Sequence, residues 1–308
     1  MGRGRAAKNI KLVEVAKEIL EEIQPCSVRA VCYKLFTVGI IDSMGVYPVK
    51  RVSEQLKWAR ENDVIPWSWI VDETRSAERP GTWADPEQFA DAALRSFRRD
   101  RWEYQPVRIE VWSEKGTVRG VLAPILDEYG ITFRVFRGFT SATVLHQVAT
   151  EFRDKPVHVF YVGDYDPSGL YMSEADLPNR LVKYGAHLHF DGACWNHNSP
   201  APCVDQIQLN RVALLPDDCG DLQSFDVITK KKDPRYGWYR KHTCGEARAW
   251  ELDAMHPPDL RDRVEDHIRR NIDIVAWERT GLAEKAEQAS LRHVLSRWSG
   301  TTLGQVPE

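Results

Sequence analysis

The sequence predicts an α/β domain with a mainly parallel, Rossmann-like sheet, preceded by a winged-helix domain and followed by a helical tail. From residue 107 onward, apolar patterns of strand and helix type alternate, which is typical of a parallel sheet. Residues 157–162 (VHVFYV) form an almost unbroken apolar run, as expected for a strand buried on both faces. Three helical patterns and a β-rich segment come first, which is the order of a winged helix. The expected domains are 1–104, 105–256 with an insertion near 191–206, and 257–308.

The N-terminal domain is expected to contain three amphipathic helices. Apolar residues at helical spacing predict the first over residues 10–23. Pro25 separates it from a second helix, for which Ser27 is the expected N-cap and Gly39 the expected stop. A third helix is expected from about 48 to 62, and the composition of residues 64–71 (VIPWSWIV) predicts a strand.

The elements that follow are predicted from periodicity and from turn residues. Residues 72–86 read as a polar linker and precede a helix over about 86–99. Strands are expected at 107–112, 131–136 and 157–162, with helices at 118–128 and 142–152. The tail should contain helices near 258–277 and 281–298.

Composition limits the broad class of the protein. Of the 308 residues, 43% are hydrophobic and 28% are charged, which is typical of a soluble globular protein. No apolar run reaches the roughly 18 residues that a membrane helix needs, and the N-terminus does not resemble a signal peptide. Six cysteines are too sparse for a disulfide scaffold. A cytoplasmic location without membrane association is therefore expected.

Charge is distributed unevenly along the chain. The first 60 residues carry eleven Lys/Arg against six Asp/Glu, although the whole chain has a net charge of −3. A basic front part suits a module that grips DNA phosphates, but unevenly charged, solvated faces would explain the pattern equally well. The cations expected to contact DNA here are Arg3, Arg5, Lys34, Lys50 and Arg51.

Two aspartates come directly after the apolar strand at 157–162. Asp164 and Asp166 lie between Gly163 and Gly169, and the earlier strand ends in Glu114. Carboxyl ends of parallel strands meet at the edge of the sheet where α/β proteins bind ligands. If the two strands are neighbours, the three carboxylates converge, and hard oxygen donors of this kind suit Mg²⁺. The plainer alternative is a turn in which the two aspartate side chains only accept hydrogen bonds from the backbone of the turn itself.

The order strand–Glu114-Lys115, an intervening β/α unit, then strand–Gly-Asp-x-Asp-Pro-x-Gly resembles the Toprim domain over about residues 107–190. It is most similar to the A subunit of type IIB DNA topoisomerases (topoisomerase VI) and the related meiotic double-strand-break transesterase. The resemblance implies that Glu114, Asp164 and Asp166 bind Mg²⁺ and that the substrate is DNA. Lys115 belongs to the same motif, and Arg137 could orient a phosphate.

A later segment resembles a Glu-containing element of the same subunit. Glu251 or Asp253, in the run WELDAM, would supply an extra metal ligand. The preceding lysines, Lys230, Lys231 and Lys232, would hold the DNA backbone. The alternative is that this run is the start of a helix and that its acidic side chains are exposed to solvent.

Topoisomerase A subunits carry a reactive tyrosine four residues after an arginine on the winged-helix domain. Arg29 and Tyr33 occupy those positions here, and residues at this spacing share one face of a helix. The sequence departs from the family pattern, because Ala30 stands where the family has Asp and Cys32 where it has an aromatic residue. Tyr33 is therefore either a nucleophile or an ordinary core residue with a wet hydroxyl.

Other constellations are weaker. Cys194, His197, Cys203 and Cys219 have irregular spacing for a zinc site. Trp67 and Trp69 would share one strand face and could stack on bases, although packing explains them as well. A Gly-x-Ser-x-Gly motif, which would indicate a serine hydrolase, does not occur in the sequence.

The resemblance therefore predicts a Mg²⁺-dependent, DNA-cleaving isomerase in which Tyr33, aided by Arg29, performs a transesterification. It also implies a homodimer and a separate ATPase subunit. Two alternatives stay open. One is a Toprim nuclease in which water attacks the phosphate, and the other is a non-catalytic DNA-binding or scaffold protein.

Overall fold

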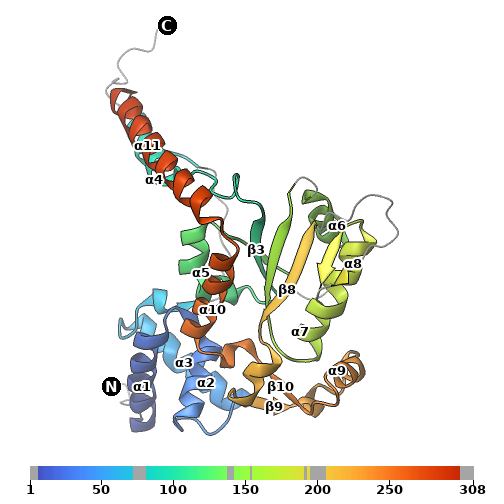
Figure 1. Cartoon of the computed structure of the whole chain (residues 1–308). Coiled ribbons are helices and arrows are strands. Elements are labelled where there is room, and N and C mark those ends of the chain that lie inside the picture. The colour runs from blue at the N-terminus through green and yellow to red at the C-terminus, as the bar shows by residue number, and fades with distance from the viewer. Residues whose placement is uncertain are drawn as a thin grey trace. The chain divides into compact units, whose positions relative to one another are not determined.

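The computed structural model describes residues 6–71, 81–136, 142–152, 155–190, 193–194 and 206–298. The chain divides into two compact units, and each contains two separate stretches of sequence (Figure 1). Residues 1–74 and 108–270 form the first unit, and residues 75–107 and 271–308 form the second. The limits of these units do not coincide with the domain boundaries expected near 104 and 256, which stay a prediction.

The first unit is built around a six-stranded sheet of order β4-β3-β5-β8-β6-β7. The first five strands in that order are parallel, and only β7 runs antiparallel to its neighbour. This mixed α/β fold is compatible with a Rossmann-like domain. The strands are β3 (Arg108–Ser113), β4 (Thr132–Val135), β5 (Val157–Val162), β6 (Leu188–Phe190), β7 (Ala193–Cys194) and β8 (Ile207–Ala213).

The expected adjacency of the two site-bearing strands is confirmed. β3 and β5 are hydrogen-bonded neighbours, and their register pairs Ser113 with Val162. Glu114 and Asp164 consequently follow adjacent strand ends at the same edge of the sheet.

Helices cover both faces of this sheet, as the apolar run in β5 predicts (Figure 1). Val157, Val159 and Tyr161 of β5 share an apolar cluster with helices on one side, whereas the Phe160 ring contacts His267 on the other. The flanking helices are α5 (Thr117–Tyr129), α6 (Ala142–Glu151), α7 (Pro167–Tyr171), the π-turn η2 (Met172–Asp176), α8 (Leu177–Lys183) and α10 (Pro257–Arg270). Gly130 ends α5 in the left-handed conformation (φ +62°), as expected of a C-terminal glycine.

The N-terminal part of this unit contains α1 (Ala7–Ile23), α2 (Val28–Thr37) and α3 (Val46–Glu61). The three helices share one buried apolar cluster. Ser27 caps α2 as predicted, since its hydroxyl accepts a hydrogen bond from the Ala30 N–H at 3.1 Å. All three predicted helices are confirmed within two or three residues at each end.

The strand predicted over residues 64–71 is largely wrong. Only β2 (Ile70–Val71) is a strand, and it pairs in parallel with β1 (Cys26–Ser27). The preceding residues form a 3₁₀ turn, η1 (Trp67–Trp69), which Pro66 opens with φ −60° and in which the Trp69 N–H bonds to the Pro66 carbonyl. Trp67 and Trp69 therefore do not share a strand face: Trp67 is exposed under Arg60, and Trp69 packs on the helical core.

A segment of short helices and short strands follows β8 and returns to the edge of the sheet. An antiparallel pair, β9 with β10, organises it, and backbone bonds between Trp250 and Tyr165 tie it to the loop after β5. Its elements are η3 (Pro216–Gly220), β9 (Ser224–Asp226), η4 (Val227–Lys230), α9 (Tyr236–His242), β10 (Arg248–Trp250) and η5 (Leu252–Ala254).

The second unit is helical and contains α4 (Pro86–Ser96) and α11 (Ile274–Trp298). The predicted break between the two tail helices is misplaced: it lies at 271–273, and Gly281 is inside α11. Asp273 sets the break, because its carboxylate accepts hydrogen bonds from the N–H groups of Val275 and Ala276. In the part of the chain that the structure describes, each helix is too short or too polar to span a bilayer.

Candidate functional site

The turn after β5 holds Asp164 and Asp166 in a buried position. Asp164 is 7% exposed and Asp166 is 2% exposed. Asp166 caps α7, since its Oδ1 accepts hydrogen bonds from the Ser168 and Gly169 N–H groups at 2.9 and 2.8 Å. A Cβ at Gly169 would lie 2.4 Å from the Asp164 carbonyl oxygen, so this close turn requires glycine.

Arg211 of β8 underlies the same turn and was not identified from the sequence. Its guanidinium donates hydrogen bonds to the Asp164 carbonyl, to the Gly163 carbonyl at 2.9 Å and to the Ser173 hydroxyl at 2.6 Å. A positive charge thus lies beneath the acidic loop and holds its backbone. The sequence gives no distinct signal for this role, because β8 (IQLNRVA) contains other polar residues besides Arg211.

Two lysines neutralise the aspartates. Lys115 Nζ lies 2.7 Å from Asp164 Oδ1 and 3.0 Å from Asp253 Oδ2. Lys230 Nζ lies 2.9 Å from Asp166 Oδ2. Asp164 Oδ1 also accepts the Leu252 N–H at 2.7 Å. The cluster therefore joins the ends of β3 and β5 to η4 and η5, which lie far away in the sequence.

Negative charge still exceeds positive charge at this edge. Burial, and then repulsion from Asp164 and Asp166, raises the pKa of Glu114 to about 7. Burial also raises the pKa of Asp164, although Lys115 opposes the shift. Burial disfavours the charged form of Lys115, but Asp164 and Asp253 outweigh it and raise the pKa of this lysine. An additional cation would be favoured here.

The three carboxylates are hard oxygen donors of the type that Mg²⁺ prefers. In the described part of the chain, however, no group of three His, Cys, Asp or Glu side chains is arranged around a common metal position. The physical reason lies in the contacts above, since the lysine ammonium groups take up oxygens of Asp164 and Asp166 that an ion would need.

A second cluster lies on α2, where Arg29 and Tyr33 contact Glu251. Arg29 forms a two-pronged ion pair with the Glu251 carboxylate, with Nη2 at 2.5 Å from Oε1. The Tyr33 hydroxyl donates to Glu251 Oε2 at 3.3 Å. Burial and the nearby Glu251 charge raise the pKa of Tyr33, while Arg29 counteracts them. The phenol is thus held neutral with its proton directed at a carboxylate.

Asp253 links the two clusters. Its carboxylate accepts a hydrogen bond from the Ser27 hydroxyl at the start of α2 and contacts Lys115, which in turn contacts Asp164. The start of α2 and the acidic loop are therefore connected through three side-chain contacts within one unit. This arrangement brings together the residues of the two predicted motifs and of the WELDAM segment.

A pocket of about 440 Å³ opens beside Tyr33. Its lining comes from α2, from the loop before α3, and from the segment that carries β9 and η4. The lining residues are Arg29, Tyr33, Phe36, Ser43, Met44, Gln223, Ser224, Phe225, Thr229, Lys230 and Glu251. The Lys230 ammonium lies 5.7 Å from the centre of the Phe225 ring.

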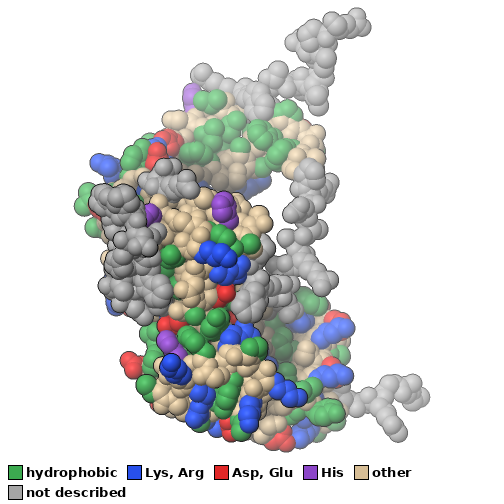
Figure 2. Space-filling model, turned by 90° about the vertical axis from the view of Figure 1, so that its right-hand side faces the viewer, with side chains coloured by type: hydrophobic (Ala, Val, Ile, Leu, Met, Phe, Trp, Pro, Cys, Tyr) green, Lys and Arg blue, Asp and Glu red, His purple; other side chains and the backbone are tan. Residues whose placement is uncertain are grey.

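The other predicted DNA-contacting cations have different surroundings. Lys50, Lys231 and Lys232 are exposed, and Lys34 is half-buried. Arg51 is engaged internally, since it donates to the Asn9 side chain at 2.8 and 3.0 Å and so joins α3 to α1. Lysine and arginine side chains gather over the lower part of the face in Figure 2, where α9 lies. Arg3, Arg5 and Arg137 lie outside the described residues.

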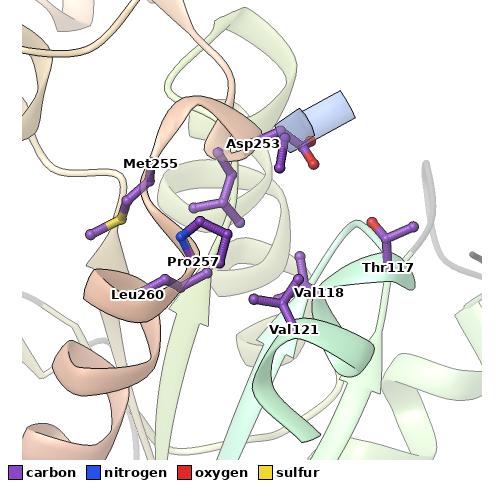
Figure 3. Close-up of a pocket in the computed structure, with 9 residues that line it drawn as sticks. Thr117, Val118, Val121, Asp253, Met255, Pro257 and Leu260 are labelled. Atoms are coloured by element: carbon purple, nitrogen blue, oxygen red, sulfur yellow. The ribbon is translucent and has the colours of Figure 1, made fainter. Parts of the chain in front are cut away.

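The departures from the family pattern on α2 have a packing explanation. Cys32 is fully buried in the N-terminal core, where a larger aromatic ring would overfill the space. Ala30 lines a small apolar pocket, in which Figure 3 shows Thr117, Val118 and Val121 of α5 opposite Met255, Pro257 and Leu260. An Asp at position 30 would lie in that apolar pocket beside Asp253.

The candidate zinc site stays a prediction, because most of its ligands fall outside the described residues. The Cys194 side chain, His197 and Cys203 lie outside them, and Cys219 is a half-buried free thiol whose Sγ lies 3.5 Å from the Leu215 carbonyl.

Comparisons with known proteins found no match for this chain, either among protein-family models or among curated proteins.

Proposed function

We propose that this chain cleaves DNA by transesterification, with Tyr33 as the nucleophile. The observation that carries the proposal is the contact between Tyr33 and Glu251, with Arg29 paired to the same carboxylate. A nucleophile within hydrogen-bond reach of a base, and a third group that orients the base, is the general arrangement for covalent catalysis. The residues come from segments more than 200 positions apart, so local sequence alone does not produce this contact.

The chemistry balances with these groups alone. Glu251 accepts the phenolic proton, and Tyr33 Oη attacks the phosphorus of a DNA phosphodiester. The P–Oη bond forms as the bond to the 3′ oxygen breaks, and that oxygen leaves as a hydroxyl, with the proton that Glu251 accepted passed to it through solvent. The 5′ phosphate remains esterified to Tyr33. Arg29 and Lys230, whose side chains are 41% and 38% exposed, lie where they can contact the phosphate oxygens.

Glu114, Asp164 and Asp166 are the residues that would hold a Mg²⁺ ion. Their donor chemistry fits, and burial together with the charges of Asp164 and Asp166, which raise the pKa of Glu114, favours a bound cation. The buried Tyr161 hydroxyl has no hydrogen-bond partner among the described residues and feels the charge of Glu114, which also suits a hydrated ion nearby. When bound, the ion would supply positive charge to the phosphate. Lys115 and Lys230 would have to release their aspartates.

The proposal includes a Toprim identity for the sheet and a winged-helix identity for the N-terminal helices. A Toprim identity for the sheet agrees with parallel β3 and β5 carrying Glu114 and Asp164 at one edge, and a winged-helix identity agrees with the three N-terminal helices. The resemblance extends the proposal to a homodimer, which supplies two sites for two strands, and to a separate ATPase subunit.

Hydrolysis by a metal-activated water is the second candidate. It is favoured by the burial of Tyr33, which is 6% exposed and held neutral, so that the phenol must be uncovered before it attacks. In that case Tyr33 and Arg29 would only secure Glu251, and the chain would be a Toprim nuclease. A non-catalytic DNA-binding protein is the remaining alternative.

A plasmid assay separates these functions. Purified protein is incubated with supercoiled plasmid and Mg²⁺, and DNA-linked protein is trapped with detergent. Transesterification predicts covalent 5′ adducts that disappear in Tyr33→Phe and Asp164→Ala but persist in Tyr104→Phe, because Tyr104 is 49% exposed and belongs to the second unit. Cutting that survives Tyr33→Phe but not Asp164→Ala would establish hydrolysis instead. DNA binding without any cutting would contradict both enzymatic functions.

A further inference from the structure

The pocket beside Tyr33 has the composition of a nucleotide site. Its volume of about 440 Å³ is within the roughly 300–1,000 Å³ typical of pockets that enclose a small ligand. A double helix is too wide to enter such a space, whereas one nucleotide is not.

Two aromatic rings, Phe36 and Phe225, line the pocket together with Met44. Phenylalanine faces can stack on any base, because every base has a π face. Arg29 and Lys230 also line the pocket and provide positive charge for a phosphate. The Ser43, Ser224 and Thr229 hydroxyls can pair with a sugar or a base edge. All three parts of a nucleotide therefore find suitable groups.

Exposed apolar side chains occur close in the sequence to residues that line the pocket. Val46 and Tyr47, which follow the lining residues Ser43 and Met44, are 80% and 86% exposed. Ile228, next to the lining residue Thr229, is 56% exposed. Exposed apolar side chains near cations are well suited to a partner that combines apolar faces with negative charge, as an unpaired base and its phosphate do.

We propose that this pocket binds an unpaired nucleotide, so that the preferred substrate is DNA with an unpaired base next to the cleaved phosphate. The inference rests on the proposed function in taking DNA as the ligand. Inside a duplex both faces of a base are covered by neighbouring bases, and the base must be extruded at a cost of a few kcal/mol before it can reach Phe225. A bulge or single-stranded segment avoids most of that cost.

The test measures binding without chemistry. Tyr33→Phe protein is titrated in EDTA with a short duplex and with the same duplex carrying one bulged 2-aminopurine, a fluorescent base that reports stacking. The bulged DNA should bind about fivefold or more tightly, which corresponds to about 1 kcal/mol of stacking, and its fluorescence should change on binding. Equal affinity for the two DNAs would overturn the proposal.

Variants locate the effect in the pocket. Phe225→Leu removes the ring but keeps an apolar side chain, and should reduce the preference to less than twofold. Phe89→Leu, at an exposed phenylalanine of α4 outside the pocket, should leave it unchanged. If Phe225→Leu does not fold, Thr229→Glu tests the same wall by opposing the phosphate from an exposed position. A preference that survives the substitution would overturn the proposal.

The outcomes distinguish this inference from the proposed function. Because the binding assay contains neither metal nor the reactive hydroxyl, a bulge preference in a protein that never cuts plasmid contradicts only the cleavage reaction. Tyr33-dependent cutting without any bulge preference contradicts only the nucleotide pocket.

Discussion

The Lys230 ammonium group lies 2.9 Å from the Asp166 carboxylate, and it belongs to a loop 64 residues further along the chain. Asp166 Oδ1 already caps α7, so Lys230 engages the remaining oxygen of this side chain. The lysine thus stabilises the buried acid and, at the same time, competes with any metal ion for it. The same applies to Lys115 at Asp164.

Replacing Lys230 with methionine should strengthen metal binding. The ammonium competitor is removed while the aliphatic stem is retained, and we expect Mn²⁺ to bind about fivefold more tightly, which corresponds to about 1 kcal/mol for a partly exposed ion pair. Electron paramagnetic resonance of free Mn²⁺ measures the affinity directly. Lys232→Met, at an exposed lysine of the same loop, serves as the control. Weaker binding by the Lys230 variant would contradict competition.

Glu251→Gln should lower the pKa of Tyr33. Burial is the largest cause of the raised value and remains in the variant, but the negative charge that adds to it is removed while Arg29 stays. The phenolate of Tyr33 should therefore appear at lower pH in the variant. Absorbance titration, taken as the difference between proteins with and without Tyr33→Phe, isolates this residue among the ten tyrosines. The variant should also lose covalent adduct formation, because the base is gone. An unchanged titration would exclude a direct contact in solution.

Gly169→Ala should disturb the acidic turn, since the added Cβ would lie 2.4 Å from the Asp164 carbonyl oxygen. We expect a loss of about 1–3 kcal/mol in the free energy of unfolding, as for other overpacked sites. Gly237→Ala in α9 is the matched control, because its Cβ meets nothing within 4 Å, and it should stabilise the helix by about 0.5–1 kcal/mol. Urea denaturation of both proteins gives the comparison. Equal stability of the two variants would argue against a tight turn.

Leu260→Ala should enlarge the small apolar pocket between α5 and α10. Leu260 is 4% exposed, and truncation of a buried leucine costs about 2–5 kcal/mol. Ile228→Ala, at a side chain that is 56% exposed, should change the unfolding free energy by less than about 0.5 kcal/mol. Thermal unfolding followed by circular dichroism checks both. A small effect at Leu260 would mean that the neighbouring helices close the cavity.

The Asp218 carboxyl should make the free energy of unfolding depend on pH in the acidic range. Burial alone would raise its pKa, but hydrogen bonds from Arg263 and from the Leu215 N–H lower it below the ordinary value. A lowered folded-state pKa contributes stability above the unfolded pKa of about 3.9, and this contribution is lost as the pH falls through the folded value. Asp218→Asn should therefore be less stable than wild type by about 1.5–3 kcal/mol at neutral pH. Urea midpoints measured from neutral to acidic pH should converge, and a constant difference would contradict the linkage.

Three of the six described strands of the sheet, β3, β4 and β5, were predictable together with its acidic edge, whereas β6, β7 and β8 were not expected. The run at 157–162 and the alternation of elements depend on local periodicity, and Glu114, Asp164 and Asp166 follow strands found in that way. The structure of residues 64–71 was not predictable. Pro66 starts a 3₁₀ turn there, and Ile70 pairs with Cys26. A pairing between residues more than 40 positions apart leaves no local pattern in the sequence.

The contacts of the charged residues were the least predictable. Arg51 resembles a DNA-contacting cation in the sequence but binds Asn9, whereas Arg211 gave no signal and holds the acidic turn. Lys115 was noticed as part of a motif, yet its two aspartate partners come from residues 49 and 138 positions away. Such pairings depend on which elements the fold brings together, and periodicity carries no information about them.

The separation in sequence between Tyr33 and Glu251 bears on when the protein could become reactive. During synthesis the tyrosine emerges first, and more than 200 further residues must follow before its partner exists. A partly made or truncated chain that ends before β9 would present α2 without Lys230, without Glu251 and without Asp253. In the proposed function, the ability to break DNA is therefore acquired only after the segment that carries η4 and η5 has been made.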